Sequence, residues 1–474
     1  MIDTGAALTR RLERYRASTR GVLAPAPPSV HADELAGRLA DALDGEVVRT
    51  SEGVIVRCES PSRPLPVDRG RLATLPGQPP AATALVCLDT ETTGLATAAG
   101  TVAFLIGLGW WESDRFRQVQ LLLPDHGEER ALLTALQAAI PPDAWLVTYN
   151  GRTFDWPLLV ARYRLARRAA PPHDGHLDLL PIVRRLFRHR MPDARLRTAE
   201  AELLGLRRVG DVEGWEIPSR YLGFLRGGSA AGLVEVVRHN DQDVRSLAWL
   251  LAHLDARLGD AASRSKAPPG DLAGLARSFA RERRLAEALT CLDAATGRAV
   301  EPRPARMTAT PSSASQAAYD EPWWSPRRQP DFGGRPPRTI PRIAAARGAP
   351  VDAPWTSERI AVDRAHLLRR IGRHREAAEA WAALAAGPGR TAIVAAIELA
   401  KLHEHRLRDR PGALAASLRG LWFVERRRRI GRPEPALEAD LLRRVARLKT
   451  TTRRPVRGLT RPRPDPTMRT TRAV

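Results

Sequence analysis

Two acidic residues stand two positions apart at the end of an apolar run: Asp89 and Glu91, in LDTETTG. If the run ALVCLD forms a buried strand, the alternation of side chains places both carboxylates on one face of the sheet. Carboxylates are preferred ligands of hard divalent ions, and two ions roughly 3.5–4 Å apart can clamp the reacting oxygens of a phosphodiester. A solvated turn after a strand produces the same pattern, so the pair needs further ligands before it indicates a metal site.

A third carboxylate follows a later strand-like run, in TYNGRTFDWPLL, where Asp155 opens a helix. An Asp at this position is commonly an N-terminal cap, because its oxygens accept backbone N–H groups and favour the positive end of the helix. The interpretation of Asp155 as a metal ligand therefore depends on its lying beside the first pair.

The segment HNDQDVRSL places His239 and Asp243 four residues apart, on one face of a predicted helix, whereas Asp241 points elsewhere. Asp243 could complete an ion site. His239 could orient or deprotonate an attacking water, since imidazole titrates near neutral pH. Taken alone, the two residues are equally compatible with a surface pair.

In order and spacing the three segments resemble the motifs of the proofreading-type 3′-to-5′ exonuclease superfamily, named for its four acidic residues Asp-Glu-Asp-Asp. The chain is also similar to bacterial YprB-type ribonuclease H-like proteins over about residues 84–254, in LDTETTG, TYNGRTFDWPLL, HLDLLPIVRRLF, GDVEGWEIPSRY and HNDQDVRSL. The resemblance implies a ribonuclease H-like fold and two bound Mg²⁺ or Mn²⁺ ions. The metal ligands that it implies are Asp89, Glu91, Asp155 and Asp243.

One position departs from the superfamily pattern. Well-characterised members place Tyr four residues, or His five residues, before the last Asp, whereas here His239 stands at the tyrosine spacing. Its role therefore stays open. Asp178 in HLDLL and Asp211 in GDVEGWEIPSRY are further acids in matching segments, and we rank them below the other four as residues that face substrate or support the ligands.

The surrounding pattern predicts an α/β domain over residues 81–258. Three strand-like runs, ALVCLD, TVAFLIGLGWW and FRQVQLLLP, precede a helix from Glu128 to Ala139, the strand WLVTYN and a helix from about Asp155 to Arg168. A long helix ending near residue 258 should close the domain. This order predicts a mixed sheet flanked by helices.

The other segments differ in character. Residues 1–80 contain a predicted helix and hairpin, and we place a domain boundary near residue 81 after a segment rich in Pro and Arg. Residues 268–298 and 355–449 resemble tetratricopeptide repeats, which imply an all-α region and a protein-binding face. Residues 299–354 have the composition of a disordered linker and residues 450–474 that of a basic tail.

The chain carries a formal charge of +22, which favours a polyanionic partner such as single-stranded DNA or RNA. Of its 75 basic residues only three are lysines, so a coding bias toward Arg explains the excess equally well.

Three widely separated cysteines form no disulfide framework. No apolar run is long enough to span a bilayer, and we expect a cytoplasmic protein without a membrane partner.

The leading hypothesis is a Mg²⁺- or Mn²⁺-dependent nuclease, acting as a 3′-to-5′ exonuclease with Asp89, Glu91, Asp155, His239 and Asp243 in its site. The alternative is a scaffold that binds nucleic acid or protein without cutting. A strand-transferring enzyme on the same fold would need substrate-pairing surfaces that the sequence does not indicate.

Overall fold

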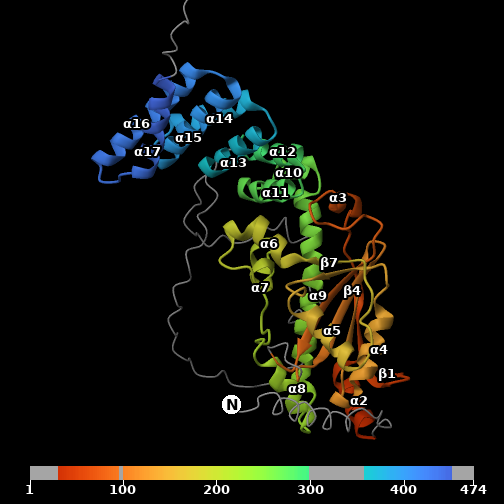
Figure 1. Cartoon of the computed structure of the whole chain (residues 1–474). Helices are drawn as coiled ribbons and strands as arrows, with labels where there is room; N and C mark the ends of the chain where they lie inside the picture. The colour runs from red at the N-terminus through yellow and green to blue at the C-terminus, as the bar shows by residue number, and fades with distance from the viewer. Residues whose placement is uncertain (1–29, 95–99, 298–356, 451–474) are drawn as a thin grey trace, which may run out of the picture. The chain divides into compact units, whose positions relative to one another are not determined.

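The structure, a computed structural model, describes residues 30–94, 100–297 and 357–450 (Figure 1). They fall into two compact units. The first, the sheet unit, comprises residues 30–284. The second, the helical unit, comprises residues 285–296 and 357–450.

A seven-stranded mixed sheet in the order β1-β2-β5-β4-β3-β6-β7 forms the centre of the sheet unit. Neighbours from β1 to β3 pair antiparallel, whereas β3–β6 and β6–β7 pair parallel. Parallel neighbours need crossover connections, which helices provide here. The strands are β1 (Glu46–Thr50), β2 (Gly53–Pro64), β3 (Leu85–Thr92), β4 (Ala103–Glu112), β5 (Arg115–Leu122), β6 (Trp145–Thr148) and β7 (Gly175–Asp178).

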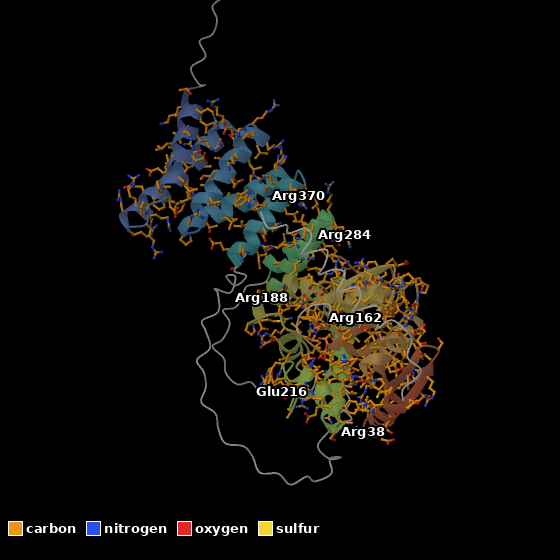
Figure 2. All side chains as sticks on the ribbon, turned by 60° about the horizontal axis from the view of Figure 1, so that its bottom comes forward. Arg38, Arg162, Arg188, Glu216, Arg284 and Arg370 are labelled. Carbon is orange, nitrogen blue, oxygen red and sulfur yellow. The ribbon has the colours of Figure 1, made fainter. Side chains whose placement is uncertain are left out.

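Helices connect and cover the strands, and α9 is the longest, drawn in green alongside the sheet in Figure 1. An ion pair joins α5 to α4, with Arg162 Nε 2.5 Å from Glu129 Oε1 (Arg162 is labelled in Figure 2). The α-helices are α2 (Val30–Leu43), α3 (Arg69–Ala73), α4 (Glu129–Ala139), α5 (Asp155–Leu165), α6 (Leu179–Phe187), α7 (Leu196–Ala199), α8 (Ile217–Leu225), α9 (Ala231–Leu258), α10 (Ala261–Arg264) and α11 (Pro269–Arg281). The mixed sheet with flanking helices confirms the predicted fold class and is consistent with a ribonuclease H-like fold.

The boundary predicted near residue 81 was wrong, because the N-terminal hairpin belongs to the same sheet. Strand β2 pairs with β5 from Val56↔Leu122 to Pro64↔Arg115, and α2 contributes Leu35 and Leu39 to the shared core. Two of the prolines that suggested a linker, Pro61 and Pro64, lie within β2, next to a register shift between Ser60 and Arg63. A bulge accommodates proline, which cannot donate a ladder hydrogen bond.

The helical unit consists of α12 (Leu285–Thr296), α13 (Ser357–Arg370), α14 (His374–Ala386), α15 (Gly389–Leu402), α16 (Arg410–Arg429) and α17 (Pro435–Thr450). The predicted all-α region is therefore present. The single repeat unit predicted at 268–298 is divided: α11 packs on α6 in the sheet unit, where Gly274 closely approaches Leu186, and α12 belongs to the helical unit. The predicted linker at 299–354 and the tail beyond Thr450 lie outside the described residues.

Within the described ranges no helix is long and apolar enough to cross a membrane. The three cysteines, Cys58, Cys87 and Cys291, are buried and form no disulfide.

Candidate functional site

The end of β3 places Asp89 and Glu91 at the mouth of the site. Both side chains are partly exposed, while Thr90 between them is buried. Asn240 on α9 donates from Nδ2 to Asp89 Oδ2 at 2.9 Å. The predicted same-face geometry of the two acids is thus combined with an amide from a distant helix.

Asp155 reaches the same region from a tight turn between β6 and α5. Asn150 adopts a left-handed conformation with φ 70°, and its N–H donates to Asp178 Oδ1 at 2.8 Å. Asp155 is the first residue of α5 and is buried. Thr90 Oγ1 donates to its Oδ1 at 2.6 Å. The carboxylate is therefore held against β3, and Asp178 acts locally by fixing the turn.

Helix α9 approaches the sheet closely because β4 carries two glycines opposite it. A Cβ on Gly107 would lie 2.2 Å from Asn240 Oδ1, and one on Gly109 would lie 2.9 Å from Val244 Cγ1. The absence of side chains at these positions lets α9 bring His239 and Asp243 to the end of β3. His239 Nε2 lies 3.7 Å from Asp243 Oδ2 and 4.0 Å from Glu91 Oε1.

The four carboxylates interact electrostatically. Burial, followed by the charges of Asp243, Asp155 and Glu91, raises the pKa of Asp89 well above its usual value. Burial also raises the pKa of Glu91 to about 8, although His239 opposes this, and that of Asp155 to about 6 despite the hydrogen bond from Thr90. Asp89 and Glu91 are harder to ionise because they are buried and because Asp155 and Asp243 are near, so the site favours a compensating cation.

His239 is held in place by Asp211, from the loop that follows α7. Its Nδ1 lies 2.7 Å from Asp211 Oδ1. Burial disfavours the protonated ring, but Asp211, Asp243 and Glu91 together raise the pKa of His239 to about 9. The same contact helps to lower the pKa of Asp211 to about 2, against the effect of burial. Asp211 therefore contacts a predicted site residue directly, although the sequence placed it below the four main carboxylates.

Sequence reasoning missed Arg208 and Glu200. The Arg208 guanidinium pairs with Asp243, lies 3.1 Å from Asp211 Oδ2 and donates from Nε to Glu200 Oε2 at 2.7 Å. Glu200 is fully buried and also accepts from Ser246 Oγ on α9. No periodicity or motif distinguished either residue, because one Arg among 72 carries no signal of its own.

Asp241 is buried away from the four acids, as predicted: its Oδ1 accepts from Ser60 Oγ at 2.6 Å, and Arg245 pairs with its other oxygen.

Chemically, the four oxygen-bearing side chains suit a hard divalent cation. In the described part of the chain, however, no three His, Cys, Asp or Glu side chains are arranged to hold a metal ion as they stand. The hydrogen bonds explain this. Asp243 is engaged by Arg208 and Asp89 by Asn240, so metal binding would require these carboxylates to reorient.

Comparison with known proteins addresses the same region. Residues 86–255 match the model of the RNase_H superfamily. A stretch of 176 residues is 40% identical to the uncharacterized protein YprB of Bacillus subtilis (strain 168). That stretch is 37% of this chain and 42% of the relative, so the chain spans less than half of the curated protein that it matches. Residues 86–255, which match the superfamily model, include all five predicted site residues and also Glu200, Arg208 and Asp211.

Proposed function

We propose that the sheet unit is a divalent-metal-dependent nuclease that hydrolyses phosphodiester bonds of DNA or RNA, as a 3′-to-5′ exonuclease. The superfamily match supports nuclease chemistry and nucleic-acid binding in general. The observation that carries the proposal is the mutual repulsion of Asp89, Glu91, Asp155 and Asp243, four acids from three separate elements.

Asp89, Glu91, Asp155 and Asp243 are the residues that would hold the metal. Bound Mg²⁺ or Mn²⁺ ions would supply positive charge and Lewis acidity at the scissile phosphate. The chain's own groups position the ligands: Thr90 orients Asp155 and Asn240 orients Asp89. Asp211 fixes the orientation of the His239 ring so that Nε2 faces Glu91 and Asp243, where it can donate to a water or hold a proton.

The test uses the full chain with Mn²⁺ and a 5′-labelled single strand. Shortening from the 3′ end, with loss of activity in Asp89→Asn and Asp243→Asn, supports the proposal. A circular single strand distinguishes the cleavage mode, because an exonuclease leaves it intact. Equal activity in the two variants and the wild type would instead indicate a contaminating nuclease and overturn the assignment.

A second candidate is a scaffold that binds nucleic acid or protein without cutting. The pairing of Arg208 with Asp243 favours it, since an internal cation already compensates part of the acidic charge. Calorimetric titration with Mn²⁺ separates the candidates. A nuclease should bind the ion with an affinity that Asp89→Asn reduces at least tenfold, and a scaffold should show no saturable binding at this site.

The predicted tetratricopeptide character of the helical unit remains part of this proposal. Its successive helices α13 to α17 pack against their neighbours in chain order, as in a helical repeat array, and a partner-binding face would position the nuclease on its substrate.

A further inference from the structure

The positive charge of the chain is unevenly distributed. Residues 30–284 contain 33 Lys and Arg against 32 Asp and Glu, so the sheet unit is almost neutral. Residues 357–450 contain 21 basic and 11 acidic residues. Because a nucleic-acid strand is attracted by basic surface, the sheet unit contributes little net attraction.

Helix α16 concentrates this charge. It contains six Arg and one Glu, and four of the Arg form its last turn. Arg427 and Arg428 are used within the unit, because Arg427 lies 2.9 Å from Glu434 and Arg428 pairs with Glu438 of α17. Arg426 and Arg429 are exposed, and Arg429 also pairs with Glu425, one turn earlier, at 3.2 Å between Nε and Oε1. Figure 2 shows nitrogen-tipped side chains projecting from the helices of this unit, with Arg370 labelled on α13.

An aromatic ring is exposed beside these arginines. Trp422 is 57% exposed, and the guanidinium carbon of Arg426, one turn later, lies 5.6 Å from the ring centroid. The edge contact with Phe423, at 4.9 Å between centroids, fixes the ring. Leu418, one turn earlier on the same face, is 46% exposed. We define the α16 face as Leu418, Trp422, Arg426 and Arg429.

We propose that the α16 face binds single-stranded nucleic acid, with a base stacking on Trp422 and phosphates contacting Arg426 and Arg429. This rests on the proposed nuclease function and assigns strand capture to the helical unit. Exposed aromatic rings next to arginines bind unpaired bases without sequence preference, because every base offers a π-face.

Charge argues against other occupants. Residues 451–474 carry seven Arg and one Asp, and a second copy of α16 is equally basic, so both are repelled. An acidic membrane surface would also attract arginines, but it requires a continuous apolar helix face. On α16 the large apolar side chains of the exposed face are Leu418 and Trp422; the small Pro411 and Ala415 precede them, and the arginines follow.

The test measures binding of the full chain to a fluorescein-labelled 20-mer single strand, as DNA and as RNA, in EDTA so that no cleavage occurs. Trp422→Ala should weaken binding roughly tenfold, whereas Trp422→Phe, which retains an aromatic face, should stay near wild type. Arg426→Ala should reduce the slope of log affinity against log salt by about 0.7. Arg370→Ala, an exposed Arg on α13, is the matched control and should weaken binding less than Arg426→Ala.

Three results would overturn the proposal: unchanged binding in Trp422→Ala, equal effects of Arg370→Ala and Arg426→Ala, or tighter binding of a duplex or of phosphatidylglycerol vesicles than of the single strand. Unfolding midpoints and circular dichroism confirm that each variant is folded. Hydrolysis of a trinucleotide with Mn²⁺ is measured separately. If wild type fails to hydrolyse it while the binding results hold, the proposed function fails and the α16 face stands.

Discussion

At the scale of single residues, the candidate site is a problem of unbalanced charge. Asp89, Glu91 and Asp155 all have raised pKa values, and the cations nearest to the acids are Arg208 and the protonated His239. Like charges brought together in a partly desolvated site oppose folding. Such an arrangement is typical of a ligand-binding site, where a bound cation would offset the repulsion.

This imbalance predicts a trade between stability and metal binding. Asp89→Asn removes one charge from the cluster and keeps the hydrogen-bonding shape, so the metal-free variant should unfold at a higher temperature than wild type. Adding Mn²⁺ at 100 times its dissociation constant should stabilise wild type by about 2.7 kcal/mol and the variant by much less. Thermal unfolding with and without Mn²⁺ measures both effects. A variant that Mn²⁺ stabilises as strongly as wild type would remove Asp89 from the ligand set.

Arg208 should be needed for folding as well as for the site. Arg208→Met leaves Glu200 buried without its cation and Asp243 without its partner, a loss of roughly 3–5 kcal/mol in the free energy of unfolding. The matched control is Arg197→Met, whose pair with Glu213 at 3.5 Å is exposed and should contribute less than about 1 kcal/mol. Urea denaturation of both variants makes the comparison, and similar small losses would mean that the buried ion pairs of Arg208 stabilise the fold no more than the exposed pair of Arg197 does.

These residues also show which parts of the candidate site could be predicted from the sequence. Asp89, Glu91, Asp155, His239 and Asp243 could be named as candidates in advance, because their segments resemble the motifs of a known superfamily in order and spacing. Arg208 and Glu200 could not. Their importance comes from burial and from mutual distance across an irregular loop, and neither quantity leaves a periodic trace in the sequence.

At the scale of elements, the site depends on how closely α9 approaches β4. Their separation is set by Gly107 and Gly109, since any side chain at either position would overlap Asn240, Val244 or Phe116. The sequence run TVAFLIGLGWW predicted a strand correctly, but the reason for its glycines appears only when α9 lies over them. The same limit explains the misplaced boundary near residue 81. Pairing of β2 with β5 is a long-range contact that the local proline content obscured.

Gly107→Ala should therefore displace α9 and disturb Asn240 at the site. Overpacking of this kind typically costs about 1–3 kcal/mol, and the variant should also lose Mn²⁺ affinity. Gly223→Ala is the control: a Cβ there meets nothing within 4 Å, and alanine in the middle of α8 should stabilise the protein by about 0.5–1 kcal/mol. Urea denaturation gives both signs. If Gly107→Ala stabilised the protein, the packing of α9 against β4 would be loose enough to accommodate a methyl group, and the proposed role of Gly107 would be wrong.

At the scale of the whole molecule, the proposals assign different tasks to the two units. The near-neutral sheet unit holds the acids, and the basic helical unit offers an aromatic ring and exposed arginines, so the proposed metal binding and the proposed strand capture would depend on different side chains. The composition alone could not separate a functional basic surface from a coding bias, because both raise the same total. The uneven distribution between residues 30–284 and 357–450 supports the proposed basic surface, since a coding bias alone would be expected to raise the charge of both segments.

Acid should act on the sheet unit through histidines that are buried in their neutral form. Burial, followed by the charges of Arg190 and Arg257, lowers the pKa of His253 to about 4 from 6.5. Between these values the unfolded chain holds a proton that the folded chain lacks. This contribution to stability is complete above pH 6.5 and is lost as the pH falls toward 4, at about 1.4 kcal/mol per pH unit.

Glu91 and Asp155, with raised pKa values, act in the opposite sense over part of this range, so the comparison must be made between variants. His253→Gln should reduce the loss of stability between pH 6.5 and 5 relative to wild type, and it should do so only in the unfolding transition of the sheet unit. Urea denaturation at both pH values tests this, and an unchanged pH dependence would mean that His253 is already protonated in the folded protein.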